Sequence, residues 1–62
     1  MKTNEFIRLL KKHGCFLVRQ AGGSHEVWRS PITNNEFVIP NHPAKELGTG
    51  LAKKILKQAG IK

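Results

Sequence analysis

The sequence has little of several residue types, and each shortage excludes a class of site or structure. One cysteine, Cys15, occurs among 62 residues, which excludes an internal disulfide and a zinc site made of several cysteines. Aspartate is absent, so the chain has no Ser–His–Asp catalytic triad. No apolar run approaches the roughly 18 residues of a membrane span, so we expect no membrane partner. A small domain without disulfides is typical of a reducing compartment, and we expect a cytoplasmic protein.

Acidic residues are also scarce, which makes the chain strongly basic. Eleven lysines and arginines face four glutamates, giving a formal net charge of +7. This balance indicates a polyanionic partner, either a nucleic acid or an anionic surface. The glutamates are scattered, whereas two-metal nucleases need clustered carboxylates, and the three histidines lack the spacing of metal ligands. We therefore expect neither a metal site nor any other cofactor.

The hydrophobic pattern predicts a single domain, residues 1–62, of the α+β class with the element order α-β-β-β-α. Apolar residues recur at helical spacing near both ends of the chain, and three short β-rich runs lie between them. The expected elements are a helix at 4–13, strands at 15–20, 25–29 and 36–39, and a final helix that ends before Gly60. Packing both helices on one face of a three-stranded antiparallel sheet buries both apolar helix faces and leaves the other sheet face open.

Residues suited to helix ends and turns mark the boundaries of these elements. Thr3 and Thr49 are the expected N-caps of the two helices, because a hydroxyl can accept a hydrogen bond from a free helical N–H. Gly14 and Gly60 are expected to stop the helices. The two asparagines at 34–35 tolerate the positive φ angle that a tight hairpin needs.

Side chains of the middle strand are expected to alternate between the two faces of the sheet. His25 and Glu26 should therefore point to opposite faces and not form a catalytic pair. Trp28 is expected in the core, with stacking on a nucleic-acid base as the alternative. Cys15 is expected to be a small buried side chain and not a nucleophile.

The run Gly22-Gly23-Ser24-His25 is the strongest candidate for a functional site. Two glycines let the backbone approach a ligand closely and present N–H groups to an anion, and Ser24 adds a hydroxyl. Imidazole gains and loses a proton near neutral pH, so His25 is suited to take a proton from a ribose 2′-hydroxyl. Taken alone, the run favours an ordinary hairpin turn followed by an edge histidine, because short glycine-rich turns are common.

A second histidine and several basic side chains complete the candidate site. His42 has a proline near it on each side, and it is interpreted as a second proton-transfer group, a phosphate contact or a plain surface residue. A lysine-rich helix face is often only solvated, but the high net charge favours phosphate binding. The candidate phosphate contacts are Arg19, Arg29 and Lys45 near the sheet and loops, and Lys53, Lys54 and Lys57 on the final helix.

Three segments, taken together, resemble the HicA toxins, the small mRNA interferases of bacterial and archaeal toxin–antitoxin pairs. They are the residues 17–25, which contain Gly-Ser-His, the segment 38–42, and the ending 51–61. Gly-Ser-His alone is a weak signal, but three segments in the same order over nearly the whole chain are specific. The resemblance implies a fold like the double-stranded-RNA-binding domain, endoribonuclease activity on mRNA with His25 as the catalytic residue, and a HicB antitoxin that blocks the active site.

Alternative functions remain open from the sequence. In the first, the chain is a toxin that cleaves mRNA without a metal and so inhibits translation and growth, with Ser24 and the glycine amides near the scissile phosphate. In the second, the same fold is a non-catalytic RNA-binding module that recognises shape and phosphates. A third possibility, a membrane-surface protein using its amphipathic final helix, is disfavoured because that apolar face is needed for the core.

Overall fold

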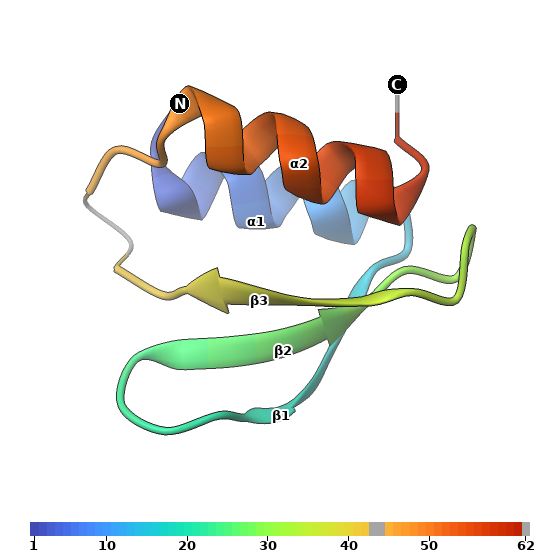
Figure 1. Ribbon diagram of the computed structural model, residues 1–62, viewed down its shortest axis with the longest axis horizontal. Helices are drawn as coiled ribbons and strands as arrows, with labels where there is room; N and C mark the ends of the chain where they lie inside the picture. Colours follow the sequence, from blue (N-terminus) through green and yellow to red (C-terminus); the bar gives the residue numbers. More distant parts are fainter. Residues whose placement is uncertain (43–44, 62) are drawn as a thin grey trace.

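The computed structural model describes residues 1–42 and 45–61, and over these residues the order α-β-β-β-α is confirmed. The bounds expected for the first helix and the three strands differ from the observed ones by one residue at most. The elements are α1 (Thr3–Lys12), β1 (Phe16–Gln20), β2 (His25–Arg29), β3 (Glu36–Pro40) and α2 (Thr49–Ala59) (Figure 1).

The strands of the described residues form an antiparallel sheet in the order β1-β2-β3, and both helices cover the same face of it (Figure 1). The register of the central pair sets Glu26 opposite Ile39 and Trp28 opposite Phe37. All four side chains are buried, so this is the face that packs against the helices. Because side chains alternate along a strand, the residues between them point to the opposite face, which neither α1 nor α2 covers.

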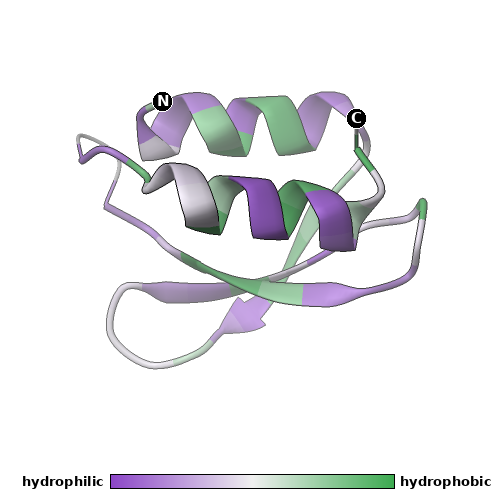
Figure 2. Cartoon of the chain, turned by 45° about the horizontal axis from the view of Figure 1, so that its top comes forward, coloured by the Kyte–Doolittle hydropathy of each residue, from purple (hydrophilic) through white to green (hydrophobic). Residues whose placement is uncertain are grey.

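The core lies between the helices and the sheet. Both helices show alternating bands of hydrophilic and hydrophobic residues, as an amphipathic surface helix does (Figure 2). Trp28 and Cys15 are buried, which confirms their expected places in the core. The apolar stripe of α2 is also used in the core, which removes the basis for a membrane-surface protein. The buried cluster is Phe6, Leu10, Cys15, Trp28, Phe37, Ile39, Leu47, Ile55, Ala59 and Ile61.

Left-handed residues end both helices, as the sequence predicts. Gly14 has φ +87° and Gly60 has φ +74°, a conformation that glycine adopts without strain. The N–H of each following residue, Cys15 and Ile61, donates to a carbonyl in the last turn of its helix at 3.0 Å. The hairpin between β2 and β3 contains the one positive φ of a non-glycine residue in the described chain, Asn34 at +64°, as expected.

The two predicted N-caps are wrong. The N-cap positions are Lys2 and Gly48, and neither makes a side-chain capping hydrogen bond. Thr3 is the first residue of α1, and both its N–H and its Oγ1 donate to the carbonyl of Lys45, at 3.0 and 3.1 Å. The segment that contains Lys45 therefore supplies the hydrogen-bond partner at the start of α1, in place of a side-chain cap. Thr49 likewise lies inside α2, and its side chain is exposed.

Strand β1 forms an exposed edge of the sheet. All five of its residues are exposed, and its register with β2 is irregular between Leu17 and Arg19. An irregular register of this kind bends an edge strand and increases its twist.

Candidate functional site

The turn between β1 and β2 presents open backbone. Gly22 and Gly23 have φ angles of +72° and +54°, which L side chains rarely adopt. A methyl group added at either position would meet no heavy atom within 4 Å. The turn is closed by hydrogen bonds from the His25 N–H to the Gly22 carbonyl at 3.1 Å and from the Ala21 N–H to the His25 carbonyl at 2.9 Å. A ligand can therefore approach this backbone closely.

His25 is the first residue of β2, and its side chain is exposed. Glu26, the next residue, is only 7% exposed and lies on the helix-covered face. The expectation that these two side chains point to opposite faces is confirmed. Pairing with Pro40 holds the backbone of His25 between the turn and the end of β3.

The structure brings the two candidate histidine segments together. The Oγ of Ser24 lies 3.0 Å from the Nε2 of His42. The Asn41 N–H donates to the Ser24 carbonyl at 2.7 Å, so a backbone hydrogen bond supports the same junction. His42 thus lies next to the residue that precedes His25, although 18 positions separate Ser24 from His42 in the sequence. Asn41, which sequence reasoning missed, is part of this junction.

Two of the predicted phosphate contacts lie near this junction. Arg19 pairs with Val27, which lies two residues after His25 in β2. Arg19 and His25 therefore point to the same open face of the sheet. Lys45 donates its backbone N–H to the His42 carbonyl at 2.9 Å, which keeps Lys45 in the same loop region. Both side chains are exposed.

The remaining predicted phosphate contacts are less well placed. Arg29 lies at the far end of β2 from His25, and its Nη2 forms an ion pair with Glu36 at 2.8 Å. The lysines of α2 are exposed on the helical layer, which lies on one side of the sheet (Figure 1). His25 faces the other, open side, because side chains alternate and Glu26 is buried under the helices. The structure therefore confirms that the α2 lysines lie apart from the sheet residues, and it also separates Arg29 from Arg19 and Lys45. The α2 lysines are Lys53, Lys54 and Lys57.

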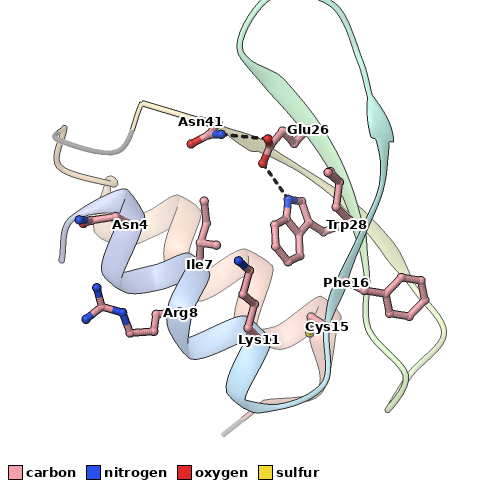
Figure 3. A pocket seen from close by; sticks show the side chains of 10 residues that line it. Asn4, Ile7, Arg8, Lys11, Cys15, Phe16, Glu26, Trp28 and Asn41 are labelled. Atoms are coloured by element: carbon pink, nitrogen blue, oxygen red, sulfur yellow. Dashed lines mark hydrogen bonds between the residues drawn. The ribbon is translucent and has the colours of Figure 1, made fainter.

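A pocket of about 590 Å³ lies between α1 and β1, on the helix side of the sheet (Figure 3). The sequence does not predict it, because its lining residues come from α1, β1, β2 and the loop after β3. Glu26 and Asn41 line its inner end, and each is the sequence neighbour of a candidate histidine. Its full lining is Asn4, Ile7, Arg8, Lys11, Cys15, Phe16, Leu17, Glu26, Trp28 and Asn41.

Among the described residues, no three His, Cys, Asp or Glu side chains come together as metal ligands would. In the same part of the chain, α1 and α2 have 10 and 11 residues, and neither is a candidate membrane span.

Comparison with known proteins decides the family. The model of the HicA toxin of bacterial toxin–antitoxin systems matches residues 3–61. The chain belongs to the HicA toxin family. A probable mRNA interferase HicA from Pseudomonas fluorescens (strain Pf0-1) is 44% identical over 63 residues, which cover 100% of this chain and 98% of that protein. A probable mRNA interferase HicA 2 from Photorhabdus laumondii subsp. laumondii is 39% identical over 62 residues, with both chains covered completely.

Membership of the HicA family confirms the resemblance found in the sequence. No solved structure matches the chain. The roles of His25, Ser24 and His42 therefore stay predictions that rest on the geometry of this HicA chain.

Proposed function

We propose that this HicA chain is a toxin that cleaves mRNA without a metal ion, with His25 as the catalytic residue. The observation that carries the proposal is the contact between Ser24 Oγ and His42 Nε2 at 3.0 Å, directly beside the exposed His25. Cleavage of an RNA phosphodiester needs one group that takes a proton and one that gives a proton, on the two sides of the phosphate. Two imidazoles near one open turn can supply both. The names of the two relatives, both probable mRNA interferases, point to the same substrate.

The reaction is an internal transfer within the RNA. His25 takes the proton of the 2′-hydroxyl while the 2′-oxygen forms a bond to phosphorus and the P–O5′ bond breaks. His42 in its protonated form gives a proton to the leaving 5′-oxygen. The products are a fragment ending in a 2′,3′-cyclic phosphate and a fragment with a 5′-hydroxyl. Each proton transfer contributes about 10²- to 10⁴-fold to the rate.

The turn and its basic neighbours support the charge that develops on the phosphate. The open backbone of Gly22 and Gly23 allows a phosphate oxygen to come within hydrogen-bond distance of N–H groups. Ser24 adds a hydroxyl donor, and Arg19 and Lys45 add positive charge from the open face and the adjoining loop. The lysines Lys53, Lys54 and Lys57, with Arg29, contribute to the general attraction of RNA.

A HicB antitoxin is the proposed protein partner. The toxin–antitoxin family implies an antitoxin. A strongly basic chain is bound most readily by a partner that supplies acidic groups. We place that contact over His25, since covering an exposed catalytic side chain blocks the RNA directly.

The proposal is tested with purified chain and a long mRNA in excess EDTA, beside a folded His25→Ala variant. Cutting by the first and not by the second supports it, and the fragments should carry 2′,3′-cyclic phosphate. Equal RNA binding by both proteins with no cutting by either would favour the non-catalytic RNA-binding module instead.

A further inference from the structure

The pocket between α1 and β1 has the size and lining of a site for one nucleotide. Its volume of about 590 Å³ is within the usual range for small-molecule sites, roughly 300–1,000 Å³. Its walls include the apolar side chains of Ile7, Leu17 and Trp28. Flat apolar walls suit the faces of a nucleobase, whose edge needs polar partners.

Among the residues that the structure describes, one acceptor position at the inner end of the pocket has no donor. The Oε2 of Glu26 accepts hydrogen bonds from Gln20 at 3.2 Å and Asn41 at 2.9 Å, and its Oε1 accepts one from the Trp28 indole at 3.1 Å. Figure 3 shows the bonds from Asn41 and Trp28. A carboxylate has about four acceptor positions, so these three bonds from described residues leave one, on Oε1. Because a buried carboxylate gains from each further donor, this position favours a ligand that supplies an N–H.

The rim of the pocket is cationic. Lys11 and Arg8 both come from α1, and the Lys11 ammonium lies 6.0 Å from the centre of the Trp28 ring. Figure 3 shows the Lys11 side chain extending from α1 toward the indole of Trp28. An acceptor at the inner end, apolar walls and positive charge at the rim together match a base with its attached phosphate.

We propose that this pocket binds one base of the RNA that carries an exocyclic amino group, which is adenine, cytosine or guanine. The amino group donates to the free position of Glu26 Oε1, and the attached phosphate lies against Lys11 and Arg8. Uracil is disfavoured because it has no exocyclic amino group, and the two carbonyls beside its N3–H would repel the carboxylate.

The inference rests on the proposed function for its place in the reaction. Glu26 and Asn41 adjoin His25 and His42 in the chain, but Glu26 points to the helix side of the sheet and His25 to its open side, so the strands lie between the pocket and His25. A base held here therefore belongs to another nucleotide of the bound RNA, and not to the one at His25. The pocket contributes to the choice of the RNA that is bound.

The test uses the fluorescence of Trp28, the single tryptophan of the chain. The folded His25→Ala variant is titrated with AMP, CMP, GMP, UMP and inorganic phosphate at millimolar concentrations. We expect saturable quenching by the first three nucleotides and binding of UMP that is weaker by about tenfold, as one charge-assisted hydrogen bond gives. Inorganic phosphate should leave the fluorescence unchanged.

A matched pair of lysine variants locates the effect. Lys11→Ala removes a rim charge and should weaken nucleotide binding several-fold. Lys12→Ala removes the same charge one residue further along α1, at a side chain that does not line this pocket, and should leave binding unchanged. Equal effects of the two changes would show that only the net charge matters, and would overturn the inference.

Three other outcomes would also overturn it. They are the absence of saturable quenching, equal affinity for UMP and the other nucleotides, and equal quenching by phosphate alone. Quenching by a glutamate-rich peptide but by no nucleotide would assign the pocket to an acidic protein segment. This titration measures nucleotide binding and no cleavage, so the two proposals fail separately. A chain that binds nucleotides but does not cut RNA would reject only the proposed function. A chain that cuts RNA but binds no nucleotide would reject only this inference.

Discussion

The Oγ of Ser24 and the Nε2 of His42 lie 3.0 Å apart, which joins the turn before β2 to the loop after β3. This contact places His42 beside Ser24, the residue that directly precedes His25. Because both imidazole side chains are exposed, RNA can reach them without a change in the fold. The proposed chemistry depends on this junction.

Replacement of His42 by alanine should lower the rate of RNA cleavage by about 100-fold, because the leaving 5′-oxygen loses its proton donor. The measurement is single-turnover cleavage of a long RNA by excess protein. His13→Ala is the matched control, since His13 is also exposed but lies at the end of α1, with its Nδ1 3.1 Å from the Leu9 carbonyl. A rate unchanged by His42→Ala would remove His42 from the mechanism.

Two arginines of the sheet should differ in their contribution to RNA binding. Arg19 shares the open face with His25, whereas Arg29 is paired with Glu36. Arg19→Ala should reduce the slope of log K against log salt concentration by about 0.7, the value for one phosphate contact of single-stranded RNA. Arg29→Ala should change the slope less. The same loss of slope in both variants would contradict this division of the basic residues.

Two glycine-to-alanine changes in α2 and its C-terminus should act in opposite directions. Gly60→Ala places a Cβ 2.7 Å from the Thr33 Cγ2 and 2.9 Å from the Ile32 Cγ2, at a φ of +74°, and should destabilise the protein by more than about 1 kcal/mol. Gly50→Ala, within the first turn of α2 and with open space around it, should stabilise by about 0.5–1 kcal/mol. Urea unfolding of both variants measures the difference, and equal effects would refute the close packing at Gly60.

Binding of a HicB antitoxin should protect His25 from a histidine-modifying reagent. The free chain exposes this side chain, so modification should be rapid and should fall at least several-fold in the complex. His13, at the end of α1, reports whether protection is general. Unchanged modification of His25 in an inactive complex would exclude direct blocking and leave inhibition from a distance.

Local chemistry explains which parts of the fold could be predicted from the sequence. The stops at Gly14 and Gly60 and the hairpin at Asn34 need only their own backbone conformations, and all three are observed. The prediction of Thr3 as an N-cap is wrong, because its Oγ1 donates to the distant carbonyl of Lys45 and does not cap the helix. Such a contact depends on the path of the chain in three dimensions.

The candidate site shows the same limit. The runs containing His25 and His42 are recognisable from residue type, but their meeting through Ser24 depends on the sheet register and on the loop after β3. The ion pair of Arg29 with Glu36 likewise follows from the pairing of β2 with β3. The pocket beside Glu26 is lined by residues of α1, β1, β2 and the loop after β3, and their meeting depends on how the helix packs on the sheet.

The most direct test of the central claim is the chemistry of the RNA ends produced in excess EDTA by the chain and by its folded His25→Ala variant. The account predicts cleavage by the unmodified chain alone, with 2′,3′-cyclic phosphate on one fragment and a 5′-hydroxyl on the other. Fragments with a 3′-hydroxyl and a 5′-phosphate, or equal cleavage by the His25→Ala variant, would contradict it.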